Sequence, residues 1–254
     1  MMRHCVGVIM LGAMASATLG EAAPDHGDLV LHEPFEDRTL LVGSGATVKG
    51  GHFVRGFVGR GFTALNHGHG IRYAIGDRFP IHEGTLELWV RPNGSGTDAG
   101  SRAFIHAGAP FANSYPLQVL HGRILRMGAI GSTTKRGQNV SWKAGRWHHL
   151  ALTWGDGRRL KLLRNEVTPV LYHVNGYIDG VLVQEEPGFD PRSKGGMKAP
   201  DTLWIGSRDG KDPCDAIIDE LRLWKRVLDG DEIKRRYLAA RAQREERRIK
   251  APPL

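Results

Sequence analysis

The sequence predicts an all-β sandwich that ends in one α-helix. Short apolar segments with the two-residue period of strands recur up to about residue 225. Glycine is abundant, at 34 of 254 residues, as many short strands joined by turns require, and no helical repeat interrupts this region. The segment after residue 228 instead has the three-to-four-residue spacing of a helix.

The first 23 residues have the order of a secretory signal peptide. Arg3 and His4 precede an apolar run from Cys5 to Leu19, and small residues follow up to Ala23. The run is too short to span a bilayer comfortably. We therefore expect residues 1–23 to be removed, which leaves a secreted or periplasmic protein with no transmembrane segment in the mature chain. A buried N-terminal helix is the alternative.

Cys214 is then the only cysteine of the mature chain, because Cys5 lies in the signal peptide. An exported protein with a single thiol has no internal disulfide, so its core must supply the stability. The simplest expectation for Cys214 is an inert buried thiol.

Strands are expected in series along the chain. In residues 85–90, Leu86, Leu88 and Val90 alternate with three other side chains, so one face of this strand is apolar. The pair Asp179-Gly180 is typical of a tight hairpin turn. The other predicted strands are residues 29–35, 71–75, 103–106, 117–120, 124–130, 147–154, 160–164, 171–174, 181–184, 203–205 and 217–224.

A helix is predicted over residues 230–247. Asp229 and Glu232 fit a capping box, and Ile233 and Tyr237 recur at helical spacing. Residues 225–250 hold 10 basic and 5 acidic residues, so +5 of the net charge of +8 lies there. We expect the first two turns to pack on the sandwich and the remainder to be solvated. With this local charge and no nucleic-acid-binding motif, no nucleic acid partner is expected.

Five segments resemble a known family when they are taken in order. They are Gly84-Thr-Leu-Glu-Leu-Trp-Val-Arg-Pro92, Gly145-Arg-Trp-His-His-Leu-Ala-Leu-Thr-Trp154, Tyr177-Ile-Asp-Gly-Val-Leu-Val183, Leu203-Trp-Ile-Gly206 and Ile218-Asp-Glu-Leu-Arg-Leu-Trp224. Over residues 28–238 the chain resembles the laminin G-like, concanavalin A-like lectin/glucanase jelly-roll family. The resemblance implies a two-sheet antiparallel jelly-roll sandwich. With the signal peptide before it and the predicted helix after it, we expect this sandwich over residues 24–228 and a basic helix and tail over 229–254.

The resemblance does not imply one function, because this architecture hosts lectins, adhesion modules, glycan-degrading enzymes and structural domains. Retaining glycan hydrolysis needs two carboxyl groups about 5 Å apart. Glu87 stands alone, and Asp219 and Glu220 are adjacent and so point to opposite faces of a regular strand. The Tyr/His/Arg cluster that a lyase of this fold needs is not evident. We therefore predict no catalytic residues, and we interpret His67, His69 and the pair 148–149 as turn and strand residues.

Calcium is the ion that the resemblance implies. Relatives of this fold hold it at one rim, with ligands at positions that match Asn66 and Asp219. Oxygen ligands of this kind suit a hard cation. The alternative is that Asn66 caps a turn and Asp219 accepts backbone hydrogen bonds.

Acidic glycans are the favoured ligands. Arg158, Arg159 and Lys161 lie in a basic strand-like segment, and arginine can bind sulfate or carboxylate groups bidentately. Trp204 is a candidate for stacking on a sugar ring. The alternatives are a solvated strand face for the cations and core packing for the indole.

Together these features predict a secreted, non-catalytic module that binds extracellular carbohydrate. The competing hypothesis is a structural or protein–protein interaction module of the cell envelope. A glycan-cleaving enzyme of the same fold is the third hypothesis, and the oligomeric state stays open.

Overall fold

The structure is a computed structural model that describes residues 27–38, 45–94, 100–107, 117–120, 124–128, 138–140, 142–155, 172–188 and 199–250. The predicted signal peptide, residues Arg158, Arg159 and Lys161, the expected strand at 160–164 and the last four residues lie outside these ranges. Within the described ranges, no helix combines the length and the apolar character needed to cross a membrane.

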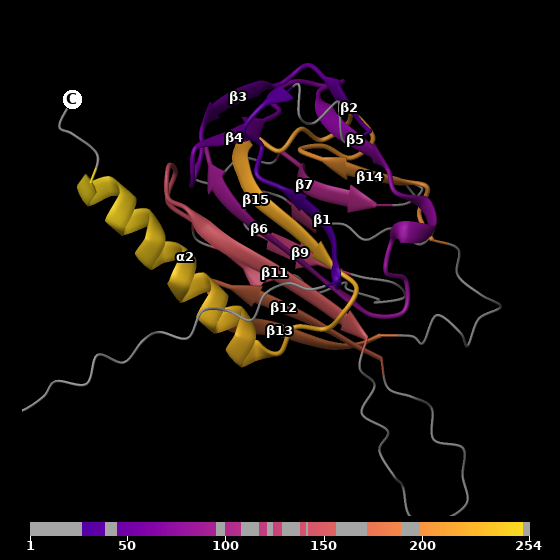
Figure 1. Cartoon of the computed structure of the whole chain (residues 1–254). Helices are drawn as coiled ribbons and strands as arrows, with labels where there is room; N and C mark the ends of the chain where they lie inside the picture. The colour runs from indigo at the N-terminus through magenta and orange to yellow at the C-terminus, as the bar shows by residue number, and fades with distance from the viewer. Residues whose placement is uncertain are drawn as a thin grey trace, which may run out of the picture.

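The strands form two antiparallel sheets (Figure 1). The first sheet has the order β13-β12-β11-β6-β15-β4-β3, and β1 also pairs with β15. Its strands are β1 (Leu29–Glu33), β3 (His52–Arg55), β4 (Arg60–Thr63), β6 (Gly84–Pro92), β11 (His148–Gly155), β12 (Tyr172–Ile178), β13 (Val181–Gly188) and β15 (Ala216–Trp224).

The second sheet has the order β10-β9-β8-β7-β14-β5-β2. Its strands are β2 (Ala46–Lys49), β5 (Gly70–Ala74), β7 (Arg102–Ala107), β8 (Leu117–Leu120), β9 (Ile124–Met127), β10 (Gln138–Asn139) and β14 (Thr202–Ile205). A short 3-10 helix, η1 (Gly76–Arg78), follows β5. Buried residues of both sheets form one hydrophobic core between them. The predicted antiparallel sandwich is therefore confirmed.

Strand β6 lies in the middle of the first sheet and has the two faces that its alternation predicts. The three aliphatic side chains at positions 86, 88 and 90 belong to the core between the sheets. Thr85, Glu87 and Trp89 point to the other side, the outer face of the first sheet, and are nevertheless at most 3% exposed. They are buried because the C-terminal helix covers this face.

The sequence does not predict β2, β3, β4 or β10. Strand β10 has only two residues, and β2, β3 and β4 carry polar, charged or glycine residues at two or three of their four positions, so no apolar run marks them. The predicted hairpin turn is confirmed: Asp179 and Gly180 have φ of 52° and 76°, and Ile178 pairs with Val181 across the turn. Positive φ at both central residues is the geometry of a tight primed turn.

Cys214 is a free, fully buried cysteine. Its Sγ lies 3.2 Å from the carbonyl oxygen of Ala216, and burial raises the pKa of the thiol to about 11. A buried thiol of this kind carries no thiolate at neutral pH, so it is chemically inert.

Helix α2 (Gly230–Lys250) lies along the outer face of the first sheet, as Figure 1 shows in yellow. Asp229 is confirmed as the N-cap, because the backbone N–H of Glu232 donates to its Oδ1 at 2.7 Å. The other half of the predicted capping box is replaced, since the side chain of Glu232 binds Arg226. Ile233 is completely buried, whereas every residue from 241 to 250 is exposed. The helix is three residues longer than expected, and its N-terminal half provides most of the packing.

Replacing Asp229 with Ala removes the acceptor for the first turn of α2. We expect the free energy of unfolding to fall by about 1 kcal/mol, the usual effect of losing an N-cap, as measured by urea denaturation. Asp231→Ala is the matched control, because Asp231 lies two residues later and does not accept that hydrogen bond. Equal losses in the two variants would contradict the capping role.

Candidate functional site

Asp219 is a buried hydrogen-bond acceptor in the structure. Its Oδ2 accepts the backbone N–H groups of Phe57 at 2.7 Å and Val58 at 3.0 Å, and Oδ1 accepts that of Glu220 at 2.8 Å. Burial raises the pKa of Asp219 to about 8, although these donors oppose the shift. Asp219 thus fixes the turn that follows β3 onto β15.

Both carboxylate oxygens of Asp219 therefore already accept backbone hydrogen bonds. This is the role that the sequence allows as the alternative to calcium binding. Asn66 is exposed in the turn after β4, where its backbone carbonyl oxygen accepts the backbone N–H of His69 at 3.2 Å. Among the residues that the structure describes, no group of three or more His, Cys, Asp or Glu side chains could hold a metal ion. A rim calcium stays a prediction.

Trp204 lies on β14 and is 6% exposed, so its ring is covered rather than presented to solvent. It pairs with Arg72 of β5 and His106 of β7 in the second sheet. Of the other expected ligand-binding residues, Arg158, Arg159 and Lys161 lie outside the described ranges. A different set of described residues, which the sequence does not single out, lines a pocket.

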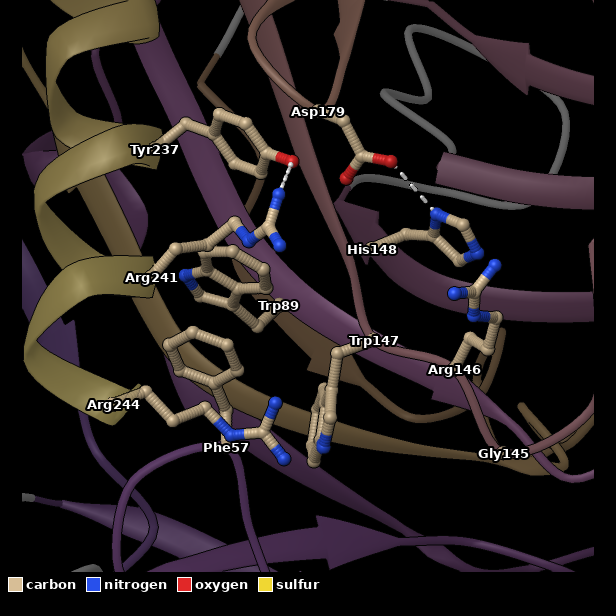
Figure 2. Close-up of a pocket in the computed structure, with 10 residues that line it drawn as sticks. All are labelled: Phe57, Trp89, Gly145, Arg146, Trp147, His148, Asp179, Tyr237, Arg241 and Arg244. Atoms are coloured by element: carbon tan, nitrogen blue, oxygen red, sulfur yellow. Dashed lines mark hydrogen bonds and ion pairs between the residues drawn. The ribbon is translucent and has the colours of Figure 1, made fainter. Parts of the chain in front are cut away.

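This pocket has a volume of about 420 Å³ and lies between α2 and the outer face of the first sheet (Figure 2). The outer-face pocket is lined by Phe57, Trp89, Gly145, Arg146, Trp147, His148, Asp179, Tyr237, Arg241 and Arg244. These residues come from the turn after β3, from β6, from the start of β11 and the loop before it, from the β12–β13 hairpin and from α2.

Aromatic rings form the base and one wall of the pocket. Phe57 stacks on Trp89 with ring centroids 3.7 Å apart and an interplanar angle of 13°. Trp147 packs edge-on against Phe57 at 5.7 Å. Tyr237 lies over Trp89 at 5.7 Å. Phe57 and Trp89 are buried, whereas Trp147 and Tyr237 are partly exposed and can contact a ligand.

Three arginines line the same pocket. The guanidinium of Arg244 lies 4.9 Å from the ring centroid of Phe57, and Nη1 of Arg241 donates to Oη of Tyr237 at 3.0 Å. Arg146 lies on the opposite side of the pocket, beside His148 (Figure 2). Partial burial and the charges of Arg91 and Arg55 lower the pKa of Arg244. The pocket is therefore both aromatic and cationic.

Asp179 is the one carboxylate among the described residues that line the pocket. Its Oδ2 lies 2.9 Å from Nδ1 of His148, and its Oδ1 accepts the backbone N–H of His149 at 2.9 Å. Burial alone would raise its pKa, but these hydrogen bonds hold the pKa of Asp179 below its usual value. His148 is held in turn by stacking on Trp142 at 5.2 Å.

Helix α2 is held over the pocket by a buried ion pair with β6. Arg236 donates to the carboxylate of Glu87 from Nη2 at 2.7 Å and from Nε at 3.0 Å, while its guanidinium covers Trp224 at 4.5 Å. Nε2 of His149 lies 3.4 Å from the same carboxylate. Burial would raise the pKa of Glu87, but His149 and Arg236 outweigh it and lower that pKa to about 2.

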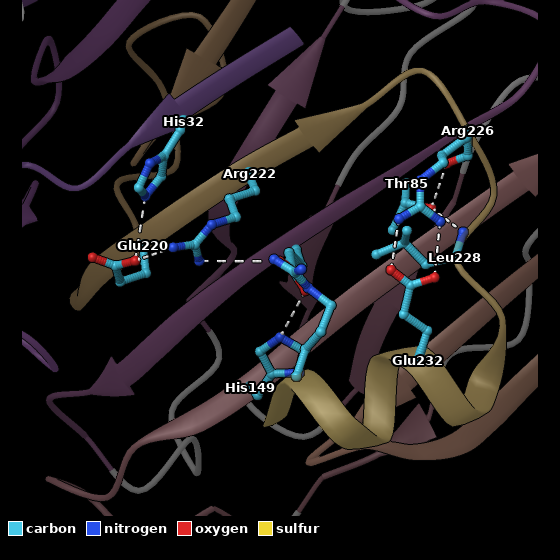
Figure 3. Close-up of polar contacts among 10 residues, drawn as sticks. His32, Thr85, His149, Glu220, Arg222, Arg226, Leu228 and Glu232 are labelled. Carbon is cyan, nitrogen blue, oxygen red and sulfur yellow. Dashed lines mark hydrogen bonds and ion pairs between the residues drawn. The ribbon is translucent and has the colours of Figure 1, made fainter. Parts of the chain in front are cut away.

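Further polar contacts join the start of α2 to the sheet (Figure 3). The side chain of Thr85 donates to the carbonyl of Arg226 at 2.9 Å and accepts the N–H of Leu228 at 2.9 Å. Arg226 also forms two hydrogen bonds with Glu232, at 2.6 and 2.8 Å. The segment between β15 and α2 is therefore fixed from both sides.

The sequence signals for the pocket are weak because its residues are far apart in the chain. Glu87 and Arg236 are 149 positions apart, so the partner of this lone strand carboxylate is not readable from local spacing. Alternation on β6 also places Glu87 on the face opposite the core, where a charged side chain is expected to be solvated, so its burial has no local signal either.

A family model described as the concanavalin A-like lectin/glucanases superfamily, Laminin_G_3, matches residues 68–234. No curated protein matches the sequence significantly.

Three solved structures illustrate the similarity in fold. Domain 4 of AbnA, a GH43 extracellular arabinanase from Geobacillus stearothermophilus in complex with arabinotriose, is 19% identical with a TM-score of 0.53, and the match covers 82% of this chain and 97% of that one. A Trypanosoma rangeli sialidase in complex with the inhibitor DANA is 18% identical with a TM-score of 0.52, covering 76% of this chain and 29% of that one. The receptor-binding domain of botulinum neurotoxin type G is 14% identical with a TM-score of 0.50, covering 76% and 46%.

These identities show the fold alone. The chain spans less than a third of the sialidase chain, so that enzyme's activity does not transfer to it.

Replacing Glu87 with Gln tests the ion pair that holds α2. Because the pKa of Glu87 falls from 4.5 in the reference state to about 2 in the folded protein, the ionised carboxylate stabilises the folded state above pH 4.5. This stabilisation, about 3 kcal/mol, is lost as pH falls toward 2.

We expect Glu87→Gln to lower the free energy of unfolding by that amount at pH 6 and by much less at pH 2, measured by urea denaturation. Glu185→Gln, on an exposed strand position, is the control. A constant difference between parent and Glu87→Gln across this pH range would contradict the proposed linkage.

Proposed function

The chain belongs to the concanavalin A-like lectin/glucanase superfamily, and from this premise we propose that it is a non-catalytic module that binds acidic glycans in the outer-face pocket. The observation that carries the proposal is the combination of Arg146, Arg241 and Arg244 with the partly exposed rings of Trp147 and Tyr237. We propose further that the module is exported, as residues 1–23 predict.

The chemistry of the pocket suits a sugar that bears a carboxylate or sulfate group. The apolar face of a sugar ring packs on an aromatic side chain, and guanidinium groups form charge-assisted, bidentate hydrogen bonds to planar anions. The volume of about 420 Å³ falls in the range of small-ligand sites. Asp179 and His148 bind each other at 2.9 Å and so shape the polar side of the pocket.

The carboxylate content of the pocket supports binding rather than hydrolysis. Asp179 is the only acidic side chain among its described lining residues, and both of its oxygens already accept hydrogen bonds or an ion pair. Hydrolysis by the common mechanism requires two carboxyl groups across the scissile bond.

A second candidate function is cleavage of an acidic glycan by elimination. One observation favours it: Tyr237, His148 and arginines line one pocket, a cluster that the sequence alone does not reveal. Incubating the protein with acidic polysaccharides and following the ultraviolet absorbance of an unsaturated product separates this function from binding alone.

The Arg241→Gln/Arg244→Gln variant tests the binding site. We expect the parent to bind uronate-containing or sulfated glycans on an array, and the variant to bind them at least tenfold more weakly, because it loses two charged hydrogen-bond donors. Binding by the parent should also weaken with added salt.

Lys234→Gln/Arg235→Gln removes the same charge from exposed positions of α2 and is the matched control. The array is run in calcium and in chelator, so loss of binding in chelator would support the rim ion. Absence of acidic-glycan binding by the folded parent would favour the envelope protein–protein module instead.

A further inference from the structure

Positive charge extends beyond the residues that line the outer-face pocket. Arg55 at the end of β3, Arg91 on β6, and Arg244 and Arg248 on α2 form a group that we call the arginine track. The charges of Arg55, Arg91 and Arg248 all act on Arg244, and Glu245 is the acidic side chain that opposes them. Arg244 is therefore the point at which the track meets the pocket.

In the part of the chain that the structure describes, most arginines of the track have no carboxylate partner. Arg248 pairs with Glu245 at 3.3 Å, an exposed contact of small energetic value, whereas Arg55, Arg91 and Arg244 form no ion pair with a described carboxylate. Arg55 also lies directly opposite Arg60 across the β3–β4 hairpin, and like charges in that position destabilise a sheet.

Aromatic rings hold two of these cations in place despite their mutual repulsion. Arg91 lies 5.5 Å from the ring centroid of Trp147, and Arg244 lies 4.9 Å from that of Phe57. Such contacts are attractive and leave the outer N–H groups of the guanidinium available. The arrangement fixes several donors at the edge of the pocket without satisfying their charge.

We infer that the ligand is a chain of several acidic sugar units, which places one unit in the outer-face pocket and continues past Phe57 across the arginine track. This inference rests on the proposed function. A single acidic sugar fills the pocket and leaves the charges of Arg55, Arg91 and Arg248 unmatched, whereas a polymer presents anions repeatedly along its length. Each exposed contact is weak, so the affinity should grow with chain length and fall with salt.

Heparin oligosaccharides of increasing length, from disaccharide to octasaccharide, test the inference with the full chain by titration calorimetry. We expect the parent to bind the octasaccharide about tenfold or more tightly than the disaccharide, because several weak charge contacts are added. The Arg55→Gln/Arg91→Gln/Arg248→Gln variant should lose that gain, yet bind the disaccharide within about twofold of the parent. Its octasaccharide affinity should also depend less on salt.

Lys49→Gln/Lys211→Gln/Lys225→Gln removes the same charge at exposed positions elsewhere and should retain most of the length dependence. If the triple arginine variant has a lowered melting temperature, Arg55→Gln/Arg248→Gln, which leaves the partly buried Arg91 in place, replaces it. Equal affinity for all lengths, or equal losses in the arginine variant and the lysine control, would overturn the track and leave the pocket as a single-sugar site. Absence of binding at every length would overturn the proposed function as well.

Discussion

The buried ion pair between Glu87 and Arg236 is the contact on which the outer-face pocket depends. Tyr237, Arg241 and Arg244 lie on the turns of α2 that follow Arg236, so this anchor sets their position over the sheet. The cost of desolvating both charges makes such a pair a poor source of net stability, and an apolar pair of similar size would stabilise the fold equally well. We interpret its value as geometric, because a bidentate contact fixes the rotation and register of the helix.

The base of the pocket depends on a second buried carboxyl group, that of Asp219. It holds the backbone of Phe57 against β15, and Phe57 in turn stacks on Trp89 and carries Arg244 on its face. A residue that the family resemblance marks as an ion ligand thus positions the aromatic base through backbone hydrogen bonds. One carboxylate in a sequence is compatible with either role, because cations and N–H groups compete for the same oxygen lone pairs.

Most of the fold can be predicted from the sequence, since alternation on β6, the Asp179-Gly180 turn and the Asp229 cap are local signals that the structure retains. The site could not be predicted, because its residues come together only through packing of α2 on the sheet. The alternation of β6 places Glu87 on the face opposite the core, but only the docked helix makes that face a second interior. Strand β3 is not predicted either, because two of its four residues are polar, although the turn after it supplies Phe57.

The basic character of the C-terminal segment divides into two parts along the outer face. Near the start of α2, Arg226 pairs with Glu232 and Arg236 with Glu87. Toward its end, Arg241 and Arg244 contact rings and hydroxyl groups, and no described carboxylate neutralises them. Arg236 therefore has a carboxylate partner from the fold, Glu87, whereas Arg241 and Arg244 have none among the described residues. A basic sequence alone does not explain why these two arginines at the pocket lack a described carboxylate partner. An anionic ligand would neutralise these guanidinium groups.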